Sequence, residues 1–395
     1  MMVDSLDDTI DKSASAVRKV PRTKINPNTT LLLYVRAGGH CQLRGCNHYV
    51  MEHRTTKRTG NFAQQAHIVA FQEKGPRGLE GERPVDINDV SNLMLLCHEC
   101  HDEVDKKNPH LYSRESLEEM KGEHEARIRL VTGLVPANAS HVIAFSAPIA
   151  GRSRPIIVEE MLPALLPRYP ASSEATKIDL SALDGLESDG LLEAACREID
   201  GKLESALRAD GPAKRVGHIS VFAIGPMPLL IYLGARLGDK VPSDLYQLHR
   251  SGPPWNWPPE GASVKFVHRV IEDRGAGSKA ALLLSLSGPI SPDAIPSDIR
   301  ETHTLHEIAL NGVVPTPGFL NSRQSLEEFR KTYHEVQSVI AEMHGDTSPI
   351  SLFPAVPAPI AVSCGRDRLQ KVRPPLRVYE FNRADGGCRF RLEVK

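Results

Sequence analysis

Four cysteines in two short-spaced pairs place the strongest constraint on how this chain folds. They form a Cys-x4-Cys and a Cys-x2-Cys spacing, at Cys41, Cys46, Cys97 and Cys100. Thiolates at such spacing bind Zn²⁺ tetrahedrally, and two pairs brought together make a closed structural site. The sequence therefore predicts one structural zinc ion with these four ligands. Ordinary buried cysteines are the alternative, and the paired spacing argues against it.

Two histidines and an asparagine accompany the cysteine pairs. His67 lies in the stretch AHIV, Asn92 precedes the apolar run LMLL, and His101 follows Cys100 directly. Hydrolysis of a phosphodiester needs a base that takes a proton from water and a cation that stabilises the phosphate. Neutral imidazole is the side chain best matched to accepting a proton near pH 7. These residues are therefore candidates for phosphodiester hydrolysis.

The combined pattern resembles the HNH nuclease motif with a zinc site around its catalytic hairpin. The resemblance implies an α+β, zinc-bearing ββα-metal domain that uses Mg²⁺ or a similar divalent cation. It implies that His67 is the general base and that His101 is a ligand of the catalytic ion. Asn92 would then bond the backbone and orient His67.

One position departs from the motif. Many HNH enzymes place an aspartate before the base as a second metal ligand, and this chain has Ala66 there. Either the ion has fewer protein ligands, or Gln65, Asp102 or another residue supplies one. A non-catalytic zinc module with incidental histidines is the alternative.

Positive charge is concentrated near the motif. The formal net charge of the whole chain is −1. Between Lys12 and Arg58, however, stand ten lysines or arginines and a single acid, Glu52, so this stretch carries +9 (ten minus one). Beside a nuclease motif, this favours a basic arm that tracks DNA phosphates over a solvated tail.

The composition is that of a soluble globular protein, with 41% apolar and 25% charged residues, and 395 residues suffice for two or three domains. No apolar run is long enough to span a bilayer, and the N-terminal residues are too polar for a signal peptide. Cys196, Cys364 and Cys388 have no partner in sequence, which favours a reducing cytoplasm. We therefore expect a cytoplasmic protein without a membrane partner.

From His141 onward the pattern changes to α/β. The predicted strands are 141–149, 218–225, 264–272, 279–288, 302–310, 350–364, 377–381 and 388–394. Amphipathic helices are predicted at 190–209 and 323–344, with apolar faces that core packing explains. The predicted organisation is a flexible arm (1–25), an HNH domain (26–132), a linker (133–140) and an α/β domain (141–395).

Several strands of this second part end in small, turn-forming residues. In open α/β sheets, ligands bind beyond the carboxyl ends of strands, where backbone amides and a helix N-terminus meet a phosphate. One early and one central strand end of this kind suggest two related halves. The stretches 141–152, 217–250, 353–368 and 376–381 resemble the SAVED domain. That resemblance implies two fused CARF-like Rossmannoid units that sense cyclic oligonucleotides.

The predicted ligand pocket lies at the turns 225–228 and 287–289. Its candidate residues are Gly225, Pro226, Met227, Ser287 and Gly288, with Trp255 and Trp257 as stacking platforms and Lys240 and Arg250 as phosphate partners. For each tryptophan, filling an edge of the core is the alternative. For each cation, surface solvation is the alternative.

Taken together, the chain resembles the HNH–SAVED effectors of CBASS, a bacterial anti-phage system. The resemblance implies that a cyclic di- or trinucleotide binds the sensor, promotes self-association and activates largely non-specific cutting of double-stranded DNA. Two alternatives are an HNH restriction endonuclease with a domain that senses DNA modification and a non-catalytic, zinc-stabilised DNA-binding regulator.

Overall fold

The chain forms two compact units, Met1–Leu134 and Val135–Lys395. The boundary falls inside the stretch 133–140, which the sequence assigns to a linker. The predicted arm lies outside the described residues except for Lys24 and Ile25. The computed structural model describes residues 24–172, 175–183, 188–208, 210–259, 261–369, 372–382 and 386–395.

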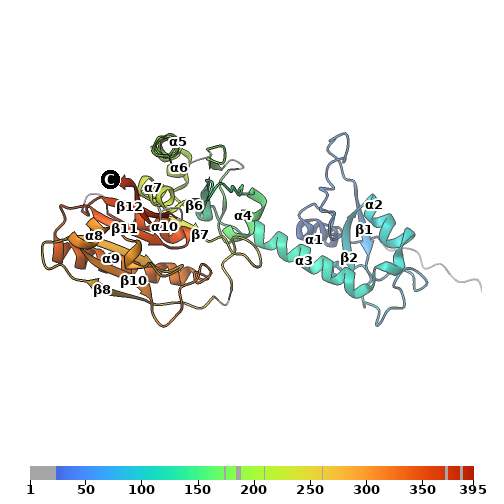
Figure 1. Cartoon of the computed structure of the whole chain (residues 1–395). Helices are drawn as coiled ribbons and strands as arrows, with labels where there is room; N and C mark the ends of the chain where they lie inside the picture. The colour runs from blue at the N-terminus through green and yellow to red at the C-terminus, as the bar shows by residue number, and fades with distance from the viewer. Residues whose placement is uncertain are drawn as a thin grey trace, which may run out of the picture. The chain divides into compact units, whose positions relative to one another are not determined.

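The first unit is built on a β-hairpin followed by a helix (Figure 1). Strands β1 (Ala63–His67) and β2 (Leu93–Cys97) pair antiparallel, and α2 (His98–Asp102) continues directly from β2 into a π-helical turn. The remaining helical elements are α1 (Pro27–Ala37), η1 (Val90–Asn92), η2 (Glu103–Lys107), η3 (Pro109–Leu111) and α3 (Arg114–Thr132). This order is the ββα arrangement that the sequence predicts.

The hairpin is held by a core from both flanking helices. All five residues of β2 are buried, and they pack with Leu33 and Ala37 of α1 and Leu117 of α3. Helix α1 begins where the Asn26 side chain accepts a hydrogen bond from the Asn28 amide, and it ends at Gly38 with φ 59°. The turn after α1 leads directly into the first cysteine pair.

The second unit contains two sheets. In the first, the strand order is β4-β3-β6-β7 with β5 beside β3, and all pairs are parallel. In the second, the order is β13-β12-β11-β9-β10-β8, with a parallel centre and antiparallel edge strands. The strands are β3 (Ala139–Ser146), β4 (Tyr169–Pro170), β5 (Thr176–Asp179), β6 (Ile219–Ile224), β7 (Ser243–Tyr246), β8 (Phe266–Glu272), β9 (Lys279–Ser285), β10 (His303–Leu310), β11 (Ile350–Ala355), β12 (Leu376–Asn382) and β13 (Gly387–Val394).

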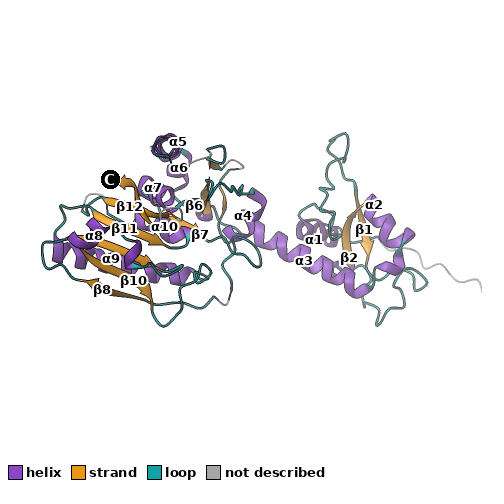
Figure 2. Cartoon of the chain, viewed as in Figure 1, coloured by secondary structure: helices purple, strands orange, loops and turns teal. Residues whose placement is uncertain are grey.

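Helices cover the sheets of this unit (Figure 2). Helix α7 lies between β6 and β7 of the first sheet in the chain but packs against β12 and β13 of the second, whereas α10 packs against β6 and β7 of the first sheet. One core therefore joins both sheets. Among the described residues, none of the helices combines the length and apolar character needed to cross a bilayer. The helices are η4 (Pro136–Asn138), α4 (Val158–Leu165), α5 (Asp189–Leu207), α6 (Pro212–Val216), α7 (Met227–Leu237), η5 (Pro292–Ala294), α8 (Ser297–Thr302), α9 (Arg323–His344) and α10 (Ala358–Arg366).

The segment 350–364, predicted as one strand, is a strand followed by a helix. Pro357 is the N-cap of α10, and a proline costs no hydrogen bond at the first positions of a helix. Residues 359–366 are all buried, so α10 lacks the alternation of apolar and polar residues by which a helix is recognised. Burial between the two sheets thus explains why this prediction was wrong.

The two halves of the second unit repeat one strand–turn–helix element. In both, a strand leads through a proline N-cap into the helix, with ψ of 144° at Pro226 and 155° at Pro357. The shared sequence pattern Phe-x3-Pro-x-Pro-x5-Gly occurs at Phe222, Pro226, Pro228 and Gly234 and at Phe353, Pro357, Pro359 and Gly365. This repeat is the structural form of the two related halves.

The repeated glycines lie where α7 and α10 touch. A Cβ on Gly234 would lie 1.9 Å from the Val362 carbonyl oxygen, and one on Gly365 would lie 1.8 Å from that of Ile231. We expect Gly234→Ala to lower the unfolding free energy of the second unit by about 1–3 kcal/mol or more, because overpacking forces the helices apart. Thermal unfolding followed by circular dichroism measures this change.

Gly201 supplies the control for this prediction. It lies within α5, and a Cβ there would meet nothing within 4 Å. Gly201→Ala should therefore raise stability by about 0.5–1 kcal/mol through helix propensity. Equal melting temperatures for the two variants would contradict the proposed close contact.

Candidate functional site

The three residues of the candidate nuclease motif lie on the hairpin and its helix. His67 is the last residue of β1 and is paired in register with Leu93, the first residue of β2. Asn92 directly precedes β2, and His101 lies in α2. The Nε2 atom of His67 is 2.9 Å from the Asn88 Oδ1 atom, so the loop before β2 also contacts the candidate base.

Asn92 ties the chain after His67 to the loop before β2. Its Oδ1 atom accepts a hydrogen bond from the Val69 amide at 2.8 Å, and its Nδ2 atom donates to the Val69 carbonyl at 3.1 Å. The same Nδ2 atom donates to the Ile87 carbonyl at 2.8 Å. Because Asn92 is only 4% exposed, loss of these bonds would leave buried backbone groups unpaired. An asparagine in this position can orient His67 through the backbone.

Carboxylates surround His101. Its Nε2 atom lies 3.4 Å from an Asp105 oxygen, one helical turn further along the chain. An Asp102 oxygen lies 3.9 Å from the Nδ1 atom of His101, and the same oxygen pairs more closely with Lys106 at 2.7 Å, a hydrogen bond that lowers the pKa of Asp102. Gln65 donates towards the Thr30 hydroxyl at 3.4 Å. Asp105, which was not among the residues named from the sequence, therefore offers an oxygen closer to His101 than Asp102 does.

Arg77 is a buried residue of this site that the sequence did not reveal. It is 6% exposed and lies in the loop between β1 and β2, with φ 58°. Its guanidinium donates to the Ile68 and Val104 carbonyls and to Asp105. Its partners lie 9, 27 and 28 residues away along the chain, so no local sequence pattern marks them.

The four predicted zinc ligands come together. Their sulfur atoms all lie within 4.8 Å of one another, and the Sγ atoms of Cys46 and Cys97 are 3.9 Å apart. A tetrahedral site with Zn–S bonds of about 2.3 Å places sulfurs about 3.8 Å apart. The sulfur positions therefore fit a zinc ion, and none of these cysteines forms a disulfide.

Hydrogen bonds also link the thiols of this cluster. A hydrogen bond with Cys100 lowers the pKa of Cys41 to about 5, and the same contact raises the pKa of Cys100. Among the described residues, this is the one group of three or more potential ligands close enough to hold a metal ion. The cluster joins the turn after α1 to the junction of β2 and α2.

The predicted sensor residues are divided between the two sheets. Gly225 follows β6, where a Cβ would lie 2.8 Å from the Phe145 ring, and it leads into the N-terminus of α7. Ser287 follows β9, and its amide donates to the Ala355 carbonyl at the end of β11. Both turns lie at carboxyl ends of parallel strands, the position at which the sequence predicts a ligand. Pro226 belongs to the first turn, Met227 is the first residue of α7, and Gly288 belongs to the second turn.

Lys240 is not brought together with these turns. It follows the C-terminus of α7 and precedes β7. It therefore lies at the amino ends of the parallel strands, whereas Gly225 lies at their carboxyl ends. The 11-residue helix α7 lies between Gly225 and Lys240 in the chain and spans about 16 Å at a rise of about 1.5 Å per residue. Lys240 and Gly225 therefore lie at opposite ends of the strands, and a role of Lys240 as a phosphate partner stays a prediction. Arg250 is exposed in the loop after β7. This loop begins at the carboxyl end of β7, the same end of the strands at which Gly225 lies.

The two tryptophans differ in their surroundings. Trp255 is completely buried, edge-on to Phe222 at 5.2 Å in a core cluster, so it has no face for a ligand base. Its prediction as a stacking platform is wrong, because the first sheet needs an apolar cover on this face. Trp257 is partly buried and lies edge-on to His249 at 5.7 Å.

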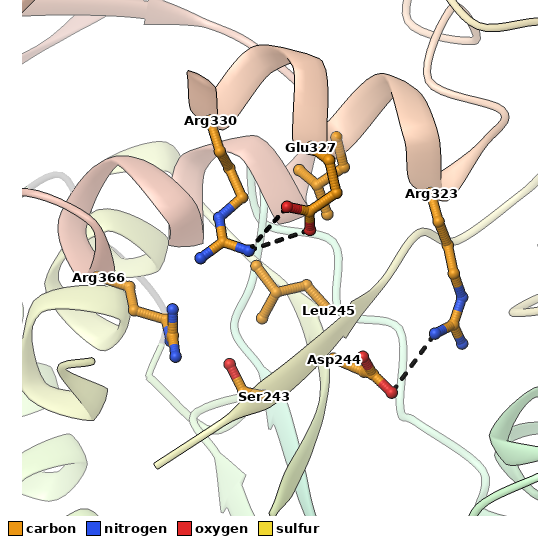
Figure 3. Close-up of a pocket in the computed structure, with 8 residues that line it drawn as sticks. Ser243, Asp244, Leu245, Arg323, Glu327, Arg330 and Arg366 are labelled. Carbon is orange, nitrogen blue, oxygen red and sulfur yellow. Dashed lines mark hydrogen bonds and ion pairs between the residues drawn. The ribbon is translucent and has the colours of Figure 1, made fainter. Parts of the chain in front are cut away.

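A small polar cavity of about 40 Å³ lies beside β7 (Figure 3). Arg330 pairs with Glu327 and Arg323 with Asp244 around it. Because its cations face carboxylates, we interpret the cavity as part of the ionic contact between the two halves. Its lining residues are Ser243, Asp244, Leu245, Arg323, Leu326, Glu327, Arg330 and Arg366.

Comparison with known families identifies both units. Residues 41–108 match the model of the HNH endonuclease family. Residues 202–393 match that of the SMODS-associated and fused to various effectors sensor domain, SAVED. The chain is an HNH–SAVED protein, with an HNH domain followed by an α/β SAVED domain. These matches confirm the predicted domain classes.

Solved structures of Cap4 SAVED/CARF-domain containing receptors are similar to this chain. One from Acinetobacter baumannii, with the cyclic trinucleotide 2′3′3′-cAAA, has 11% identity and a TM-score of 0.42, covering 72% of this chain and 57% of that chain. One from Moraxella osloensis has 10% identity and a TM-score of 0.41, covering 71% of this chain and 59% of that chain. No curated protein matches the chain.

Proposed function

We propose that this protein is a cyclic-nucleotide-activated, metal-dependent endonuclease that cuts double-stranded DNA largely without sequence preference. It would act as an anti-phage defence effector of the CBASS type in the bacterial cytoplasm. The observation that carries the proposal is the ββα site of His67, Asn92 and His101 on one chain with a sensor domain. Nuclease domains fused to sensors are suited to cutting only when a signal is present.

His67 has the role of general base in this proposal. Asn92 fixes the backbone two residues beyond it through the paired bonds to Val69. The His67 imidazole then takes the proton from the attacking water, and its contact with Asn88 limits rotation of the ring. Positioning of this kind matters because base and water must meet at hydrogen-bond distance.

His101 and Asp105 are the residues that would hold the catalytic cation, Mg²⁺ or a similar ion. Their nitrogen and oxygen atoms are 3.4 Å apart, which suits two neighbouring ligands of one ion. Mg²⁺ commonly takes one or two protein ligands and keeps several waters. Such an ion would stabilise charge on the scissile phosphate and the leaving oxygen. Asp105 would then be the second protein ligand of the cation, which Ala66 cannot be.

The sensor would bind a cyclic di- or trinucleotide at the carboxyl ends of the strands. The turns with Gly225, Pro226 and Met227 and with Ser287 and Gly288 support this, because backbone amides at such ends suit phosphates. Trp257 and Arg250 belong to the loop that begins at the carboxyl end of β7. We expect the ligand to promote self-association. This requires that the ligand bind the assembled state more tightly than the unassembled state.

Supercoiled plasmid tests the proposal against the two alternatives. Full-length protein with Mg²⁺ is incubated without nucleotide and with a panel of cyclic di- and trinucleotides, while mass photometry follows its assembly. We expect nicked and linear DNA, and an increase in mass, only with a particular nucleotide. Cutting without any nucleotide would favour the restriction endonuclease. Binding of DNA without cutting under every condition would favour the zinc-stabilised regulator.

A further inference from the structure

Arg77 contacts both elements of the proposed nuclease site. Its Nε atom donates to the Ile68 carbonyl at 2.6 Å, directly after His67. Its Nη1 atom donates to the Val104 carbonyl at 3.2 Å, and its Nη2 atom to Asp105 at 2.5 Å. One guanidinium therefore joins the strand that ends in His67 to the helical segment that follows His101.

Two features of Arg77, its buried charge and its backbone conformation, cost folding free energy. Its hydrogen bonds must compensate for that cost. Its side chain is 1% exposed, and a charged group loses hydration when it is buried. Its φ of 58° is left-handed, which is uncommon for residues other than glycine. Two of its bonds go to carbonyls, as in an ordinary loop support. The third goes to a carboxylate whose other oxygen is 3.4 Å from His101.

We propose that Arg77 is a positioning residue of the nuclease site, an inference that rests on the proposed function. It orients Asp105 so that one oxygen bonds the guanidinium and the other faces His101. It also sets the spacing between His67 and His101 through Ile68. The planar fork of arginine can reach three acceptors in fixed directions, which the single ammonium of lysine cannot.

Arg83 offers a matched comparison in the same loop. It donates to the carbonyls of Gly78, Ala70 and Phe71. Among the described residues, these bonds all stay within the loop and do not reach α2 or Asp105. Replacing Arg83 removes loop support of a similar kind while leaving the ion pair of Arg77 in place.

The first test measures binding of Mn²⁺ by electron paramagnetic resonance, which does not depend on DNA cutting. Full-length wild type, Arg77→Ala, Arg77→Lys and Arg83→Ala are compared, with zinc content measured in each. Loss of a group that orients a metal ligand typically weakens metal affinity by about 10–100-fold. We expect that loss in Arg77→Ala, a smaller one in Arg77→Lys and a change below about threefold in Arg83→Ala.

The second test follows plasmid cutting under the activating condition. Arg77→Ala should lower kcat by about 100-fold with little change in KM for DNA, because transition-state positioning is lost. Added guanidinium should restore part of that rate. Asp105→Asn should be slow too, and the double variant should be no slower than the slower single variant, since both residues act as one unit.

Three outcomes would overturn the inference. They are unchanged Mn²⁺ affinity in Arg77→Ala, equal losses in Arg77→Ala and Arg83→Ala, and additive effects of the Arg77 and Asp105 substitutions. If Arg77→Ala does not fold, Arg77→Lys and Asp105→Asn carry the same comparison. Wild type that binds Mn²⁺ but cuts no DNA would refute the proposed function alone. Wild type that binds Mn²⁺ and cuts DNA, beside Arg77→Ala with unchanged Mn²⁺ affinity, would refute the role of Arg77 alone. Wild type that binds no Mn²⁺ would refute both.

Discussion

His67→Ala is expected to lower the rate of plasmid cutting by about 10²–10⁴-fold, the range for removal of a general base. The fold and zinc content should be unchanged, because His67 is partly exposed at the end of β1 and is not a zinc ligand. The rate of nicking of supercoiled plasmid under the activating condition measures the effect. Circular dichroism and zinc analysis of the same sample check the fold.

His110→Ala is the matched control for that variant. His110 is exposed in η3 of the same unit and takes no part in the proposed site. It should cut at the wild-type rate. Near-native nicking by His67→Ala would show that another group takes the proton, whereas equal losses in both variants would indicate a general defect of the unit.

Cys97→Ser should leave the first unit poorly folded. A structural zinc site contributes folding free energy directly, with apparent binding free energies of about 10–16 kcal/mol in small zinc domains. Cys97 also lies at the end of β2, so the loss of zinc would release the start of α2 and His101. Zinc per chain, proteolysis of the first unit and plasmid cutting should all fall together.

Cys196→Ser controls for loss of a thiol elsewhere in the chain. Cys196 is a free cysteine of α5, partly buried in the second unit. Its replacement should leave zinc content and cutting unchanged. Active wild-type protein without zinc would rule out the site, even though the four sulfur atoms lie close enough to hold one.

The sequence alone determined the features that depend on short spacing. The members of each cysteine pair lie within a few residues of each other, and the order of His67, Asn92 and His101 resembles the HNH motif although these residues span positions 67–101. Thiolate spacing obeys local geometry, so it can be identified without coordinates. The resemblance to the HNH motif and to the SAVED domain predicts the two domain classes, and the family matches confirm them. The catalytic roles of the three motif residues stay predictions.

Only the tertiary structure decided which distant residues meet. The sequence predicts that Trp255 and Lys240 line a pocket. The ring of Trp255, however, lies in a core cluster, and Lys240 lies at the amino ends of the strands of its sheet. Conversely, Arg77 and Asp105, 28 residues apart, bond only because the loop after β1 returns to the helix after β2. The path of the chain sets such contacts, and composition and periodicity do not predict that path.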